Sequence, residues 1–144
     1  MKSLKYPITL EYSPSKEHSL SLLTQLGEYN KSLCSSYKNA ISYGFFIKDL
    51  DNILGGAEGK LWIGSIRIDR LLVHSSLRGK GYGKELLRKI EELGRTNSAS
   101  VVVLENLSFQ DTLDFYLKHG YTITFQEEGY IENTVMYHLR KKLL

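Results

Sequence analysis

The sequence feature that most constrains the fold is a set of glycines at every second position, Gly79, Gly81 and Gly83. They follow the apolar segment 71–73 and precede a segment whose apolar residues keep helical spacing. Without a Cβ, glycine lets consecutive backbone N–H groups converge, and a helix N-terminus adds about half a positive charge. The same loop carries three cations: Arg78, Lys80 and Lys84. These properties predict an anion site, and a pyrophosphate suits it.

The segment after the loop is predicted to be an amphipathic helix. Its apolar residues lie at i, i+1, i+4 and i+7 and share one helix face: Leu86, Leu87, Ile90 and Leu93. Gly94 is predicted to end this helix. The unbroken apolar run 101–104 is typical of a strand covered on both faces. A strand, a helix and a second strand in this order predict a right-handed crossover between parallel strands.

The rest of the chain alternates short apolar segments with turn residues, which indicates a sheet with helices. Strands are expected at residues 8–12, 44–48, 53–57, 66–73, 101–104, 121–125 and 134–139. Helices are expected around residues 20–26, 84–93 and 111–118, with a further short helix within 27–43. The predicted fold class is α/β (α+β), with a central mixed sheet of roughly six to seven strands and about four helices.

Length and composition limit the class of protein. The 144 residues, 42% hydrophobic and 24% charged, fit a single domain over residues 1–144. Cys34 is the only cysteine, which excludes an internal disulfide and suits a reducing compartment. The start of the chain lacks the apolar stretch of a signal peptide, and no apolar run approaches the ~20 residues that span a bilayer. A cytoplasmic protein without membrane contact is expected.

Charge and histidine spacing exclude two further kinds of partner. The net charge of +3 arises from basic residues spread among acids, so no nucleic-acid partner is expected. The four histidines lack metal-ligand spacing, so no metal site is expected.

The glycine loop has other interpretations. A Walker A loop would need glycine and lysine where the chain has Lys84 and Glu85, which excludes it. A dinucleotide fingerprint would also need a glycine at position 84. Glu105, at the end of the next strand, could still serve as its ribose-binding acid, so a nucleotide-dependent oxidoreductase stays an alternative. A tight turn without a ligand is another, although one glycine would suffice for that.

Two motifs resemble the GNAT superfamily of acyl-CoA-dependent N-acetyltransferases. Arg78-Gly79-Lys80-Gly81-Tyr82-Gly83 is similar to its Gln/Arg-x-x-Gly-x-Gly/Ala signature. Phe115-Tyr116-Leu117-Lys118-His119-Gly120-Tyr121 is similar to its aromatic-Tyr-x-x-x-Gly-Phe/Tyr ending. Ser108-Phe109-Gln110, before the second motif, resembles a segment of a bacterial subgroup. The resemblance spans residues 44–140.

This resemblance implies acetyl-CoA as cosubstrate, held where two central parallel strands splay apart. The backbone of Leu72 and Val73 would pair with the pantetheine amides. The pyrophosphate would be held by the loop: Arg78, Gly79, Lys80, Gly81, Tyr82, Gly83 and Lys84. Many family members have asparagine at the position of Phe109, and Asn106 is expected to substitute partly for it as a contact to the CoA arm.

The resemblance also implies direct attack of an amine on the thioester, through a tetrahedral oxyanion that backbone N–H groups near Val73 would stabilise. A lysine-like amine is mostly protonated at neutral pH, and presenting it neutral costs about 4–5 kcal/mol. A general base would remove that proton. Glu105 is the first candidate, Asp69 the second and His74 a less favoured third. Tyr116 matches the tyrosine that many members use to protonate the leaving thiolate.

The sequence thus predicts an N-acetyltransferase acting on a small-molecule or peptide amine, as a monomer or homodimer. A catalytically weak acyl-CoA sensor or interaction module with the same fold is the alternative. The first 43 residues carry no motif, and the acceptor amine stays open.

Overall fold

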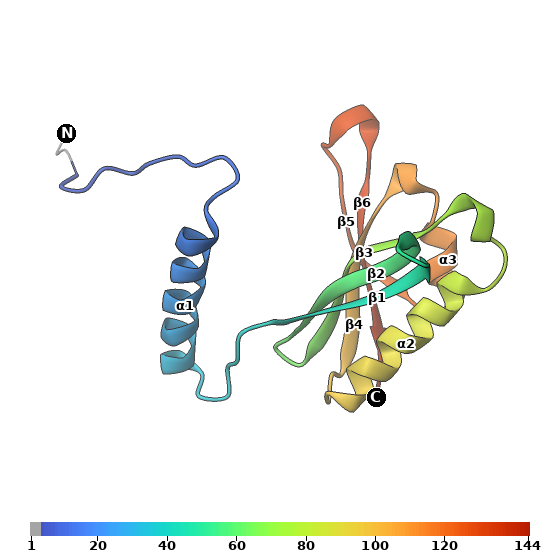
Figure 1. Ribbon diagram of the computed structural model, residues 1–144, viewed down its shortest axis with the longest axis horizontal. Coiled ribbons are helices and arrows are strands. Elements are labelled where there is room, and N and C mark those ends of the chain that lie inside the picture. The colour runs from blue at the N-terminus through green and yellow to red at the C-terminus, as the bar shows by residue number, and fades with distance from the viewer. Residues whose placement is uncertain (1–3) are drawn as a thin grey trace. The chain divides into compact units, whose positions relative to one another are not determined.

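The computed structural model describes residues 4–144, so residues 1–3, which begin the segment compared with a signal peptide, lie outside it. The described chain divides into two compact units, one ending at Asn39 and one spanning Ala40–Leu144 (Figure 1). A single domain over residues 1–144 stays a prediction. No helix within residues 4–144 is both long and apolar enough to cross a membrane.

The first unit contains helix α1 (Lys16–Leu33), which confirms the helix expected around residues 20–26. Ser15 caps it by accepting a hydrogen bond from the His18 N–H at 3.1 Å. The strand expected at residues 8–12 is wrong, because this segment pairs with no strand of the described chain and a strand needs such a partner. The separate helix expected within 27–43 is also wrong. Helix α1 continues through Gly27, where the Asn39 side chain fills the space of a Cβ.

The second unit is built on a mixed six-stranded sheet in the order β1-β2-β3-β4-β6-β5 (Figure 1). The strands are β1 (Ile41–Asp49), β2 (Asn52–Trp62), β3 (Ser65–Val73), β4 (Val101–Leu107), β5 (Thr122–Glu127) and β6 (Met136–Lys142). Every neighbouring pair is antiparallel except β3 and β4, which are parallel. This sheet confirms the predicted fold class. The described chain has three α-helices rather than about four.

Helix α2 (Tyr82–Thr96) connects the two parallel strands, as predicted, and packs on β2, β3 and β4. It does not end at Gly94, which lies inside it. The side chains of Ile66 and Leu143 fill the space that a Cβ at Gly94 would need, so this glycine brings the helix close to the sheet. Helix α3 (Leu113–Lys118) begins two residues later than expected, because Asp111 has a left-handed backbone with φ 55°.

Three single-turn 3₁₀ helices complete the described secondary structure: η1 (Ser75–Leu77), η2 (Ser108–Gln110) and η3 (Ile131–Asn133). The first joins β3 to the glycine loop, and the second joins β4 to α3.

The core of the second unit lies between α2 and one face of the sheet. Ile66, Val102 and Leu139 point into it from β3, β4 and β6, and Leu87 and Ile90 meet them from α2. Burial of such side chains contributes about 1.5–3 kcal/mol each, and this packing fixes α2 against the parallel strands.

Ile90→Ala should lower the free energy of unfolding by about 2–5 kcal/mol, because it leaves a cavity where the side chain is fully buried. The matched control is Lys89→Ala, next to it on the exposed side of α2, which should change stability by less than about 0.5 kcal/mol. Urea unfolding of both variants measures the difference. Equal stabilities would show that α2 is not anchored through Ile90.

Candidate active site

The candidate site begins where the two parallel strands stop pairing. β3 and β4 pair from Ser65 and Val101 up to Ile68 and Leu104. Beyond that point β3 continues to Val73 paired only with β2, and β4 continues to Leu107 paired only with β6. The two strands therefore leave a V-shaped opening in the middle of the sheet.

A bulge on β3 starts at this opening. Arg70 pairs with Glu58 and Ile68 pairs with Gly59, so Asp69 is the extra residue. A Cβ at Gly59 would collide with the Arg67 carbonyl, and the Tyr43 hydroxyl donates to that same carbonyl at 2.6 Å. A bulge adds twist and bends its strand. The bend therefore coincides with the loss of pairing between β3 and β4.

A groove follows the opening. Its carboxylate end, a cavity of about 450 Å³, is lined by β3, β4 and α3 and includes Asp69, Glu105, Asn106 and Tyr116. Its glycine end, about 590 Å³, runs along the loop of residues 78–84. Both ends share six lining residues: Leu71, Leu72, Arg78, Gln110, Thr112 and Phe115. They therefore form one continuous groove.

The glycine end is a helix N-terminus without a side-chain cap. Gly81, with φ 90°, is the N-cap of α2, and the first helical bond runs from the Glu85 N–H to its carbonyl at 3.0 Å. The preceding N–H groups of a helix have no intrahelical acceptor. Gly79 also has positive φ, 75°, and a Cβ on either glycine would meet open space. The backbone turn, rather than crowding, requires glycine here.

The predicted loop residues do not all reach the groove. Six of them line its glycine end: Arg78, Gly79, Gly81, Tyr82, Gly83 and Lys84. Lys80 is exposed and is not among the residues lining either end. The Arg78 Nε donates to the Val73 carbonyl at 3.2 Å, which holds this guanidinium across the mouth of the opening.

The backbone of β3 presents alternate residues to the opening. The His74 N–H donates to the Leu54 carbonyl of β2 at 2.8 Å. Because successive residues of a strand point their N–H and C=O groups to opposite sides, the backbone groups of Leu72 also point toward β2. The backbone groups of Leu71 and Val73 point into the opening. Leu72 is still one of the residues that line the groove, and it is 63% exposed.

Asn106 lies on the groove wall and is only 2% exposed. Its Nδ2 donates to Thr112 Oγ1 at 2.7 Å, and its Oδ1 is buried without a hydrogen-bond partner in the described chain. A buried acceptor left unpaired is costly. A donor from a bound molecule would relieve that cost.

Tyr116, on α3, is 6% exposed and reaches the carboxylate end of the groove. Its ring packs edge-on against Tyr121, with the ring centroids 5.7 Å apart. Burial raises the pKa of Tyr116 to about 12. Its phenol therefore keeps its proton at neutral pH and can donate a hydrogen bond into the groove.

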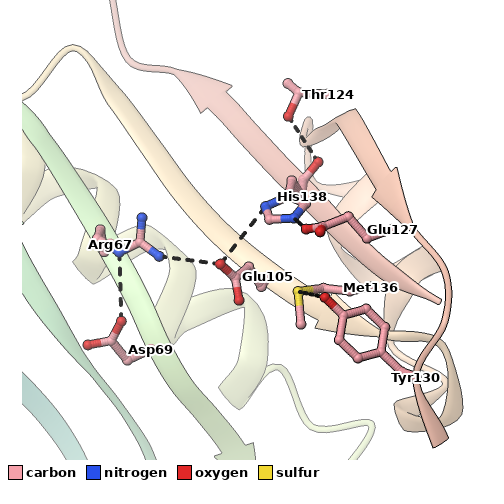
Figure 2. A network of polar contacts seen from close by, with 8 residues as sticks. All are labelled: Arg67, Asp69, Glu105, Thr124, Glu127, Tyr130, Met136 and His138. Atoms are coloured by element: carbon pink, nitrogen blue, oxygen red, sulfur yellow. Dashed lines mark hydrogen bonds and ion pairs between the residues drawn. The ribbon is translucent and has the colours of Figure 1, made fainter. Parts of the chain in front are cut away.

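The two candidate bases share one cation. Arg67 lies between them, with its Nε 3.9 Å from Asp69 Oδ1 and its Nη2 3.9 Å from Glu105 Oε1 (Figure 2). All three side chains are partly exposed, at 34–45%. The third candidate, His74, is exposed, and its Nδ1 accepts the Ser76 N–H at 3.2 Å.

The structure adds residues that sequence reasoning missed. Figure 2 shows His138 of β6 facing Glu105, and Glu127 of β5 on the far side of His138. Neither belongs to a motif, and their proximity to Glu105 arises from strand register. Phe109, Gln110 and Thr112 also line the groove beside the predicted Asn106. Phe109 and Gln110 belong to the segment that the sequence had already singled out before the second motif, whereas Thr112 carried no signal of its own.

Comparison with known proteins identifies the class. The family model of the acetyltransferase (GNAT) domain matches residues 41–123, which is more than half of the chain. The chain therefore belongs to the GNAT acetyltransferase family, and the resemblance seen in its two motifs is confirmed. It is an acyltransferase.

Individual relatives cover different shares of the chain. It is 39% identical to tRNA(Met) cytidine acetyltransferase TmcA of Aeropyrum pernix over 57 aligned residues. These residues make up 40% of this chain and 8% of that protein. It thus spans less than a tenth of that relative's length. An acetyltransferase crystal structure from Bacillus cereus is 25% identical, with a TM-score of 0.75 over 94% of this chain and 97% of that one.

One structural neighbour was solved with acetyl coenzyme A. It is a candidate streptothricin acetyltransferase from Bacillus anthracis, 20% identical, with a TM-score of 0.61 over 74% of this chain and 64% of that one. At this identity the likeness shows a shared fold.

Tyr116 should stay neutral at pH 10, where an ordinary tyrosine is about half ionised. Burial disfavours the phenolate, so its ionisation moves upward toward about pH 12. Wild type and Tyr116→Phe should therefore have the same phenolate absorbance at pH 10 while folded. In denaturant at the same pH, where Tyr116 is solvated, the wild type should absorb more by about half of one tyrosine's phenolate. A difference in the folded proteins would show that the phenol is solvated.

Proposed function

We propose that this protein transfers an acetyl group from acetyl-CoA to an amine, by direct attack of the amine on the thioester through a tetrahedral intermediate. The observation that carries this proposal is the groove at the parting of β3 and β4. It joins an uncapped helix N-terminus at one end to a neutral phenol and two carboxylates at the other. An anionic cosubstrate with a reactive acyl end matches that order.

The groove fits acetyl-CoA at three points. The N–H groups at the start of α2, with Arg78 and Lys84, suit the pyrophosphate. The outward-facing backbone of Leu71 and Val73 suits the pantetheine amides, and this moves the expected pairing from Leu72 to Leu71. The unpaired Oδ1 of Asn106 suits an amide N–H of the same arm. When bound, acetyl-CoA supplies the activated acetyl group.

Glu105 is proposed as the general base. It lines the carboxylate end together with Tyr116, and it is partly exposed, so an amine or a bridging water can reach it. Asp69 is the second candidate, on the other side of Arg67. The base takes one proton from the ammonium form of the acceptor, which leaves the nitrogen lone pair free to attack.

Tyr116 is proposed as the acid. Breaking the carbon–sulfur bond leaves a thiolate, and a neutral phenol can supply the proton that turns it into a thiol. Burial keeps that proton on Tyr116 at neutral pH. A backbone N–H facing the opening, such as that of Val73, suits the oxyanion of the tetrahedral intermediate.

The acceptor is proposed to be a small-molecule or peptide amine, and the protein a monomer or homodimer. Release of CoA thiol from acetyl-CoA in the presence of an amine library tests the proposal directly. Amine-dependent release, with the acetylated amine seen by mass spectrometry, is the expected result. Tight binding of acetyl-CoA with no acetylation of any amine would favour a sensor instead.

Gly81→Val should weaken acetyl-CoA binding by at least about tenfold, because a β-branched residue disfavours the φ of 90° that turns the loop. Gly129→Val is the matched control. Gly129 also has positive φ, 96°, and open space at its Cβ, but it lies in the loop before η3. Calorimetric titration with acetyl-CoA measures the affinity of both folded variants. Because both carry the same backbone strain, a lower affinity of Gly81→Val alone reports loss of the site. Equal affinities of the two variants would contradict the phosphate assignment.

Tyr116→Phe should lower kcat by about ten- to a thousandfold with acetyl-CoA affinity nearly unchanged, because the phenol's proton matters as the carbon–sulfur bond breaks.

Glu105→Gln should instead show its largest loss of kcat at low pH, where the amine most needs a base. Tyr130→Phe, which removes a phenol outside the groove lining, is the control. Values of kcat and KM across pH measure all three. Wild-type turnover by Tyr116→Phe would make Tyr116 a packing residue.

A further inference from the structure

His138 lies between two carboxylates on neighbouring strands. Its Nε2 is 2.5 Å from Glu127 Oε1, and its Nδ1 is 3.9 Å from Glu105 Oε1 (Figure 2). Register produces this arrangement, because Glu105 pairs with His138 across β4 and β6, and β5 runs along the other side of β6. Phe125 of β5 packs on the ring, with centroids 5.7 Å apart. The imidazole is held on two sides and is 31% exposed.

The Glu127 contact decides which ring nitrogen carries the proton. An ionised carboxylate can only accept a hydrogen bond, so the Nε2 of His138 must donate. The neutral ring then directs the lone pair of Nδ1 toward Glu105. Which nitrogen of a histidine is protonated is set by the partner of the other, as in metal and catalytic histidines. Here that partner is Glu127.

We propose that His138 relays to solvent the proton that Glu105 takes from the acceptor amine, and that Glu127 holds the ring for this role. The inference rests on the proposed function. An N–H bond of the ammonium breaks as an O–H bond forms on Glu105. That O–H bond then breaks as Nδ1–H forms, giving an imidazolium between two carboxylates. The imidazolium returns the Nδ1 proton to water, and Glu105 is ionised for the next turnover.

The separation of 3.9 Å is longer than a direct hydrogen bond. Transfer requires either one bridging water or a small rotation of Glu105, whose side chain is 45% exposed. His138 is therefore a positioning and relay residue that acts through Glu105.

Two carboxylates contact the ring, Glu105 from β4 and Glu127 from β5. Arg67 of β3 approaches the same Oε1 of Glu105 at 3.9 Å, and Arg140 lies two residues further along β6. Thr124 of β5 contacts only the backbone, donating to the His138 carbonyl at 3.1 Å. Among the described residues that contact His138, Glu105 is the one that also lines the groove.

The test compares His138→Gln, Glu127→Gln and the control Thr124→Val, using acetyl-CoA and an amine that the wild type acetylates. A lost relay leaves Glu105 to return its proton to bulk buffer. His138→Gln should therefore lower kcat by about ten- to a hundredfold in dilute buffer, and added imidazole should restore it in proportion to its concentration. Glu127→Gln should show the same pattern more weakly. Thr124→Val should match wild type in both respects.

A readout independent of turnover accompanies the kinetics. Nitrogen-15 NMR of the His138 ring should show the Nε2–H tautomer in wild type and lose that preference in Glu127→Gln. A folded His138→Gln enzyme with wild-type kcat would overturn the relay alone, and so would a loss that imidazole leaves unchanged. A wild-type protein that acetylates no amine would overturn the proposed function, and the relay with it.

Discussion

The site depends on one feature of the sheet: backbone pairing between β3 and β4 ends after Ile68 and Leu104. Two parallel strands could separate and unfold at such a point, because unpaired N–H and C=O groups are costly when buried. Here each strand keeps its other neighbour, β2 for β3 and β6 for β4. Both strands therefore stay paired on one side, while the other edge of each is available to a ligand. The proposed site is then built on strands rather than on loops.

Packing of α2 decides what lies at the two ends of this opening. The crossover helix is anchored by Leu87 and Ile90 and brought close to β3 at Gly94, which fixes its N-terminus beside the end of β3. The chain then returns through β4 and η2 to α3, which brings Tyr116 to the opposite wall. A long groove with an uncapped helix N-terminus at one end and the Tyr116 phenol at the other follows from one helix packed on one face of the sheet.

The second face of the sheet carries the charged groups. Arg67, Glu105 and His138 come from three adjacent strands and form a row across the sheet, with Asp69 and Glu127 at its ends (Figure 2). Such partly exposed pairs add little stability. Neighbouring groups in the row lie within about one water molecule of each other, and the relay proposed above uses this spacing.

The sequence by itself determined the strand–loop–helix–strand unit, because glycine spacing and helical periodicity are local properties that a short segment expresses alone. Its two motifs indicated the family by their resemblance to known members. It also named Tyr116, Glu105 and Asp69, which the structure brings to one groove. It failed at residues 8–12, which have no partner strand in the described chain. It also failed at Gly27 and Gly94, where neighbouring side chains pack against the glycine and the helix continues through it. Only the tertiary structure decided that Leu71 faces the opening, that Lys80 does not line the groove, and that His138 meets Glu105. Those facts depend on register between strands distant in the chain, which no local pattern encodes.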